Sequence, residues 1–141
     1  DIIWPFSDNM ISDNSINNNS LVCKLNYKNY SMLFTGDIEA IAEKAILKKY
    51  SKNLNILKSD ILKVAHHGSK TSSITEFIEK IKPKYAIIGV GEDNKFGHPS
   101  DNTIQNLEKA NIRIYRTDKM GEIEIKTNGK EIKINEFLKC K

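Results

Sequence analysis

The stretch that decides the fold spans residues 60–73 and reads Asp-Ile-Leu-Lys-Val-Ala-His-His-Gly-Ser-Lys-Thr-Ser-Ser. Residues 60–65 contain a short apolar run, which is long enough for a buried strand and too short for a helix. His66 and His67 come where this run ends, and Gly68 then permits a tight turn. We therefore predict that both imidazoles lie on a strand-to-helix crossover, at the carboxyl edge of a sheet, where ligands bind in open α/β folds.

Apolar patterns on both sides of this stretch predict alternating strands and helices in one domain, residues 1–141. The predicted elements are an edge strand at 1–6, a loop at 7–20, a hairpin at 21–34, a helix at 38–50, the strand at 60–65, a helix at 74–81, a strand at 85–90, a helix from 100 or 101, a strand at 112–115 and a hairpin at 122–134. This alternation predicts an α/β layer with right-handed crossovers.

Two local signals predict how elements begin and turn. Ser73 precedes Glu76 by three positions, the spacing of a helix capping box. Asn128-Gly129 lies between two alternating segments and predicts a hairpin with a type I′ turn.

Size and composition limit the class of protein. The 141 residues are 39% hydrophobic, enough for one domain with a core, and the net charge of +4 is compatible with an anionic substrate. Two cysteines, Cys23 and Cys140, exclude a disulfide framework and a zinc knuckle and favour a reducing compartment. No apolar run approaches the roughly 20 residues of a membrane helix.

Residues that can carry chemistry recur at three predicted strand ends, namely Asp37, the pair His66 and His67, and His98. A carboxylate oxygen suits a divalent metal, although Asp37 can equally be the N-cap of the helix that begins at Ile38. Adjacent histidines leave a strand end in different directions, so one can face a metal and the other the substrate. His98 can also be a plain loop residue.

Ser69, Lys70 and Thr71 stand at the predicted start of a helix. Backbone amides and hydroxyls at such a position bind anions, or merely cap the helix, and the sequence leaves both interpretations open.

Three motifs in this order carry a family resemblance: Phe34-Thr35-Gly36-Asp37, residues 62–69 and Gly97-His98-Pro99. They resemble the second half of a metallo-β-lactamase-fold hydrolase, in particular the hydrolase domain of ComEC-type competence proteins, which serve DNA uptake. Trp4-Pro5 and Asn18-Asn19-Ser20 are also similar to that family, and the resemblance covers nearly the whole chain.

The resemblance implies a four-layer α/β/β/α sandwich, of which this chain is about the second half. It implies a metal-dependent phosphodiesterase or nuclease that acts on single-stranded DNA with one or two divalent ions, zinc or manganese. Asp37 is then the bridging carboxylate, and His66 or His67 is a metal ligand, with His66 favoured because it is nearer the strand end. The other histidine and His98 face the substrate as catalytic residues, and Ser69, Lys70 and Thr71 hold a phosphate.

One departure from the family matters for activity. The His-x-His-x-Asp-His metal motif is absent, and no histidine precedes residue 66. Because residue 1 is Asp rather than Met, we expect the chain to be part of a longer protein, a domain on either side of the membrane in a membrane-associated bacterial protein. Alone it is expected to bind metal weakly, to be inactive, and to expose a sheet face that favours packing of the missing half or homodimerisation.

Two other interpretations stay open at this stage. One is a catalytically incomplete lactamase-fold domain with a binding or structural role. The other is an unrelated doubly wound α/β binding module.

Overall fold

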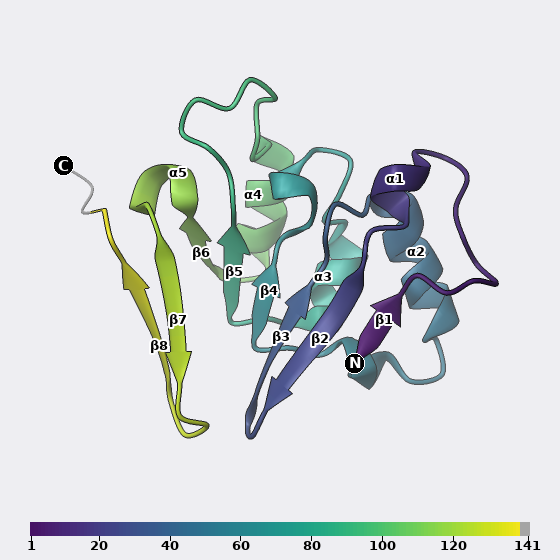
Figure 1. Ribbon diagram of the computed structural model, residues 1–141, viewed down its shortest axis with the longest axis horizontal. Helices are drawn as coiled ribbons and strands as arrows, with labels where there is room; N and C mark the ends of the chain where they lie inside the picture. The colour runs from purple at the N-terminus through teal and green to yellow at the C-terminus, as the bar shows by residue number, and fades with distance from the viewer. Residues whose placement is uncertain (139–141) are drawn as a thin grey trace.

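The computed structural model describes residues 1–138, so Cys140 lies outside the described residues, and the elements follow the predicted order (Figure 1). The strands are β1 (Ile2–Trp4), β2 (Val22–Tyr27), β3 (Tyr30–Phe34), β4 (Ile61–Lys63), β5 (Tyr85–Ile88), β6 (Arg113–Arg116), β7 (Ile123–Thr127) and β8 (Ile132–Glu136). The α-helices are α1 (Ser15–Asn18), α2 (Ala40–Lys49), α3 (Thr75–Ile81), α4 (Asp101–Lys109) and α5 (Thr117–Met120), and two 3₁₀ turns are η1 (Leu54–Leu57) and η2 (Ala65–Gly68).

The first six strands form one sheet in the order β1-β2-β3-β4-β5-β6. The pairs β1–β2 and β2–β3 are antiparallel, whereas β3–β4, β4–β5 and β5–β6 are parallel. The protein is therefore a mixed α/β fold with a mostly parallel sheet, which confirms the predicted class. Within residues 1–138, no helix is both long and apolar enough to cross a bilayer.

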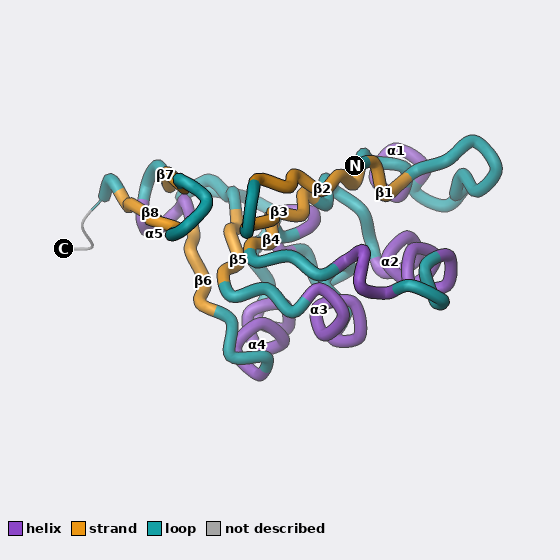
Figure 2. The backbone as a smooth tube through the Cα atoms, turned by 90° about the horizontal axis from the view of Figure 1, so that it is seen from below, coloured by secondary structure: helices purple, strands orange, loops and turns teal. Residues whose placement is uncertain are grey.

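The sheet has helices on one face and a hairpin on the other (Figure 2). Helices α2, α3 and α4 cover the first face, where Leu62 and Ile88 join the main core. Because successive strand residues point to opposite faces, Ile61 and Ile87 point away from the helices. They form a second apolar cluster with Tyr115 and the β7–β8 hairpin.

The hairpin leaves the early strands of this second face open. Leu25 pairs with Met32, which packs in the second cluster, so Leu25 and Tyr27 point to the same face as the hairpin. Their exposures are 59% and 46%, and together with the hairpin they line a groove of about 750 Å³. Part of this sheet face, at Leu25 and Tyr27, is thus exposed.

The tips of the two hairpins are joined by hydrogen bonds between residues 100 positions apart. Lys28 Nζ and Asn29 Nδ2 donate to the backbone oxygens of Asn128 and Gly129, both over 3.1 Å. The Tyr30 hydroxyl donates to the Lys130 oxygen over 2.8 Å. These bonds fix the β7–β8 hairpin against the edge of the groove.

The start of α3 differs from the predicted capping box. The helix begins at Thr75, and the Ser73 hydroxyl is buried with no hydrogen-bond partner among the described residues. The Glu43 carboxylate, from α2, instead accepts the Ser73 and Ile74 amides over 2.6 and 2.9 Å. A fully buried carboxylate from a neighbouring helix therefore takes the place that a local cap was expected to fill.

The turn of the last hairpin also differs from prediction. Thr127 pairs with Ile132, so four residues lie between the strands rather than two. Gly129 has φ +87°, while the Asn128 side chain accepts the amides of Lys130 and Glu131. The side-chain hydrogen bonds of Asn128 thus build a wider turn than a type I′ turn.

Candidate functional site

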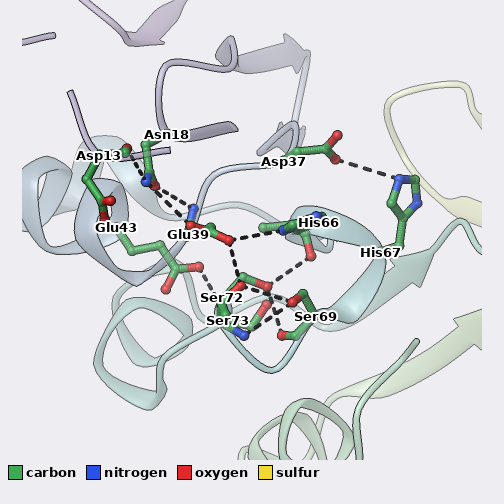
Figure 3. A network of polar contacts seen from close by, with 12 residues as sticks. Asp13, Asn18, Asp37, Glu39, Glu43, His66, His67, Ser69, Ser72 and Ser73 are labelled. Carbon is green, nitrogen blue, oxygen red and sulfur yellow. Dashed lines mark hydrogen bonds and ion pairs between the residues drawn. The ribbon is translucent and has the colours of Figure 1, made fainter. Parts of the chain in front are cut away.

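The carboxyl ends of β3, β4 and β5 bring the predicted site residues to one edge of the sheet. The Thr35 hydroxyl donates to the Lys63 oxygen over 2.6 Å, and the His66 amide donates to the Gly36 oxygen over 3.0 Å. These bonds join the loop that carries Asp37 to the turn that carries the histidines. Figure 3 shows Asp37 and His67 facing each other at this edge. Helix α2 begins at Ala40, so Asp37 is not its N-cap.

The histidine turn has a strained backbone. His66 (φ 46°, ψ 45°), His67 (φ 53°, ψ 21°) and Gly68 (φ +81°) are three consecutive residues in the left-handed region. Residues other than glycine are disfavoured there by roughly 1–2 kcal/mol each. Strain of this kind persists only where the surroundings impose it, and it is concentrated at functional sites.

His67 is the histidine that faces Asp37. Its Nε2 lies 3.7 Å from Asp37 Oδ1, and its Nδ1 lies 2.5 Å from the Gly89 backbone oxygen. Because a carbonyl only accepts, Nδ1 carries the proton, and in the neutral ring Nε2 is left as a lone-pair donor. A carboxylate oxygen and an imidazole nitrogen therefore face each other with room for a cation. The sequence favoured His66 for this position.

His66 faces the interior of the same edge. Its Nδ1 is buried and has no hydrogen bond within the described residues, and Glu39 Oε1 is 3.6 Å away. Glu39 is oriented by the Thr71 hydroxyl, which donates over 2.8 Å. Glu39 is a neighbour that sequence reasoning missed, although it stands only two positions after Asp37.

His98 lies beside His66, with ring centroids 5.7 Å apart. Burial lowers the pKa of His98, and the nearby His66 and His67 lower it further. The Asn94 side chain fixes its backbone, accepting the His98 amide over 2.9 Å and donating to the His98 oxygen over 2.8 Å.

The three predicted phosphate-binding residues, Ser69, Lys70 and Thr71, differ in burial and in hydrogen-bond partners. Ser69 is buried and its hydroxyl lies 3.0 Å from that of Thr71, which in turn donates to Glu39. These hydroxyls thus orient a carboxylate of the site, whereas Lys70 is exposed. The Ser73 and Ile74 amides, just before α3, are bonded to Glu43 and are therefore not free to bind an anion.

Lys63 is a second residue that the sequence did not single out. It is the last residue of β4, its side chain is half-buried, and its Nζ donates to the Val64 oxygen over 3.0 Å. Burial lowers the pKa of Lys63, and the negative charge of Asp37 opposes that shift. The Lys63 ammonium group is thus close enough to offset part of the negative charge of the Asp37 carboxylate.

These donors fit part of a metal site and not a whole one. Asp37 and His67 offer an oxygen and a nitrogen of the types that bind zinc or manganese. Within residues 1–138, no group of three or more histidine, cysteine, aspartate or glutamate side chains is placed to hold a metal ion.

Comparisons with known proteins identify relatives over most of the chain. No protein-family model matches it. It is 40% identical to ComE operon protein 3 of Bacillus subtilis over 78% of its length and 34% identical to competence protein ComA of Neisseria gonorrhoeae over 77%. It is also 30% identical to the uncharacterised protein YcaI of Escherichia coli over 86%.

The chain spans only 14–15% of the length of these relatives. Its similarity therefore concerns one segment of much longer proteins. The chain is a homologue of that segment of ComE operon protein 3 and of competence protein ComA.

Proposed function

We propose that the chain is the second half of a metallo-β-lactamase-type domain that hydrolyses phosphodiester bonds of DNA during competence-type DNA uptake. The observation that carries the proposal is the 3.7 Å approach of His67 Nε2 to Asp37 Oδ1 at the carboxyl edge of a mostly parallel sheet. The names of two relatives, which refer to the ComE operon and to competence, support the biological setting.

Metal binding is part of this proposal. Asp37 and His67 would hold a divalent ion, zinc or manganese, together with ligands from a segment outside residues 1–141. When bound, such an ion lowers the pKa of water toward neutrality and offsets charge on a phosphoryl group. The bond from His67 Nδ1 to the Gly89 oxygen keeps Nε2 directed at Asp37, so the two donors are preorganised.

The other residues of the edge have roles that follow from their surroundings. His66 and His98 have neighbouring rings, and either can hold a phosphate oxygen or give a proton to the leaving group. Lys70 is exposed and can pair with a phosphate of the substrate. Ser69 and Thr71 act indirectly, because their hydroxyls orient Glu39 next to His66.

The open groove is the place where the remainder of the domain would pack. Leu25 and Tyr27 expose apolar surface beside the β7–β8 hairpin, and the 110 aligned residues make up only 14% of ComE operon protein 3, which is therefore much longer than this chain. A further segment of the same polypeptide would complete both the second sheet and the set of metal ligands, which is the four-layer arrangement that the sequence motifs imply.

The test is hydrolysis of a single-stranded oligonucleotide by the full-length protein with added zinc or manganese. Asp37→Ala removes one of the two convergent donors and is expected to lower kcat at least 100-fold, on the order of one essential electrostatic group. Asp8→Ala, an exposed carboxylate in the loop after β1, is the matched control and leaves the rate unchanged.

Full activity of Asp37→Ala would remove the hydrolase proposal. If the wild-type protein binds DNA and never cleaves it with either metal, the catalytically incomplete binding domain takes its place.

A further inference from the structure

A largely exposed aromatic ring stands next to the candidate site. Phe96 is 83% exposed and lies in the loop between β5 and α4. Its ring is stacked on that of His98, with centroids 6.0 Å apart and planes inclined by 22°. Single exposed apolar residues are common, so exposure alone means little. The position of this one, against a histidine of the site, is what gives it significance.

The loop is held in place by its own side chains. Asn94 Nδ2 donates to the Gly91 oxygen over 3.2 Å and to the His98 oxygen over 2.8 Å, and Asn94 Oδ1 accepts the His98 amide. The Ser100 amide donates to the Gly68 oxygen over 2.8 Å, which ties the end of the loop to the histidine turn. The ring of Phe96 is thus presented from an ordered support.

Neighbouring rings link Phe96 to the candidate site. Phe96 is next to His98, the centroids of His98 and His66 are 5.7 Å apart, and those of His66 and His67 are 6.5 Å apart. Phe96 is the apolar member of this group, and the other three rings are imidazoles. A polymer bound at the Asp37–His67 pair can therefore extend to the flat apolar face of Phe96.

Charge near Phe96 does not by itself favour a phosphate. Glu92, Asp93 and Lys95 are all exposed in the same loop, which gives it one more negative than positive charge. A ligand held at this position is therefore held by its flat apolar face rather than by its anionic backbone.

We propose that Phe96 is a stacking platform for one base of a single-stranded nucleic acid whose neighbouring phosphate lies at the Asp37–His67 edge. The proposal rests on the proposed function for the identity of that edge. Aromatic faces bind bases of single strands without need of a specific sequence, because every base has a π face. A base that is paired and stacked in a duplex has no free face to offer, so the platform selects single strands.

The binding test uses fluorescence anisotropy of the full-length protein with a labelled oligothymidylate and with an abasic oligonucleotide of equal length. Phe96→Ala is expected to weaken oligothymidylate binding about 5- to 100-fold. It leaves binding of the abasic strand unchanged. Phe96→Trp keeps the binding of wild type, and Phe96→Leu, which is apolar without a flat ring, behaves like Phe96→Ala.

Three results would overturn the platform. The first is an equal loss for both oligonucleotides, and the second is wild-type affinity in Phe96→Leu. The third is a loss of binding to anionic lipid vesicles with unchanged binding to oligothymidylate, which would make Phe96 a membrane contact. Since Phe96 is exposed, circular dichroism of the variants is expected to match wild type.

Cleavage assays separate this proposal from the proposed function. Phe96→Ala raises KM for oligothymidylate and leaves cleavage of the abasic strand unchanged, whereas Asp37→Ala abolishes cleavage of both. If Asp37→Ala remains active, the hydrolase proposal fails while the anisotropy result still decides the platform. If Phe96→Ala cleaves oligothymidylate with unchanged KM, the platform fails and the hydrolase proposal stands.

Discussion

Two histidines in the left-handed region mark this site at the scale of single residues. His66 and His67 each carry a Cβ where glycine is favoured, and their imidazoles are retained despite that strain. This strain predicts that the free energy of unfolding depends on whether His67 is replaced by glycine or by alanine.

His67→Gly is expected to be more stable than His67→Ala by about 0.5–1 kcal/mol, because glycine relieves the φ strain and gives part of the gain back as chain entropy. Urea denaturation measures the difference. The control pair is Lys70→Gly and Lys70→Ala, whose backbone is outside the left-handed region, so there alanine is the more stable. The same order at both positions would mean that residue 67 is unstrained.

Gly68, the next residue, stands at a position that has no space for a side chain. Its φ is +81°, and a Cβ added there would lie 2.6 Å from the Pro99 Cβ. Gly68→Ala is therefore expected to lower the free energy of unfolding by about 2–4 kcal/mol.

Gly91 is the matched control for Gly68, since a Cβ added there would meet no atom within 4 Å and its backbone is outside the left-handed region. Gly91→Ala is expected to change stability by less than about 0.5 kcal/mol. Equal effects of the two substitutions in a urea titration would mean that Pro99 does not press on the histidine turn.

At the scale of elements, the start of α3 depends on a side chain from α2. Burial raises the pKa of Glu43 to about 7, while the Ser73 and Ile74 amides pull it down. The folded state then binds a proton more tightly than the unfolded chain does. Stability from this group is present at low pH and falls as pH rises from about 4.5 to about 7, by on the order of 3 kcal/mol.

Glu43→Gln removes this titration and resembles the protonated carboxyl. We expect the variant to match wild type near pH 5 and to be the more stable protein near pH 8, as measured by thermal unfolding at both pH values. Glu76→Gln is the control, because Glu76 is exposed and makes no capping bond in α3. If Glu43→Gln is instead less stable than wild type at pH 8, the two amide bonds hold the pKa of Glu43 low.

The elements were predictable to the extent that their signals are local. Alternation and apolar runs located the strands and the three long helices, and the start of α4 was narrowed to Ser100 or Asp101 because the bond from the Thr103 amide to the Ser100 hydroxyl is local. The cap of α3 was not found, because Glu43 lies 30 residues before Ser73. A sequence pattern cannot report which distant side chain reaches a helix end.

The candidate site was likewise predictable from local signals and not from contacts between distant segments. The strand ends predicted that Asp37, His66, His67 and His98 would converge, because parallel strands share a carboxyl edge. The strand-end argument favoured His66 as the metal ligand, and that preference stays a prediction. What it did not foresee is that the left-handed turn directs His67 rather than His66 toward Asp37. Lys63 and Glu39 were missed because their roles depend on burial and on contacts between loops.

At the scale of the whole molecule, Leu25 lies on the open part of a sheet face where, under the proposed function, a second sheet packs. Leu25→Lys is expected to lower the free energy of unfolding of the full-length protein by about 2 kcal/mol, since a Leu packed by a second sheet is lost. In the 141-residue chain, where this side chain is 59% exposed, the change is expected to be below about 0.5 kcal/mol.

Ile16→Lys is the control for this comparison, because Ile16 in α1 is 88% exposed, and it leaves both proteins unchanged. Leu25→Lys with equal small effects in both proteins would mean that the groove stays open to solvent. If it instead dissociates a dimer of the 141-residue chain and leaves the full-length protein unaffected, a second copy is the occupant.

The strand order has a consequence for biosynthesis. The six strands stand in the sheet in the order in which the ribosome makes them, so each one leaves the exit tunnel next to a neighbour already formed. The β7–β8 hairpin closes back on the β2–β3 turn, and its tip is hydrogen-bonded to residues 100 positions earlier in the chain. Until the β7–β8 hairpin leaves the ribosome, Ile61 and Ile87 remain exposed to solvent. A nascent chain that stalls before this point is therefore the form that chaperones are expected to bind most readily.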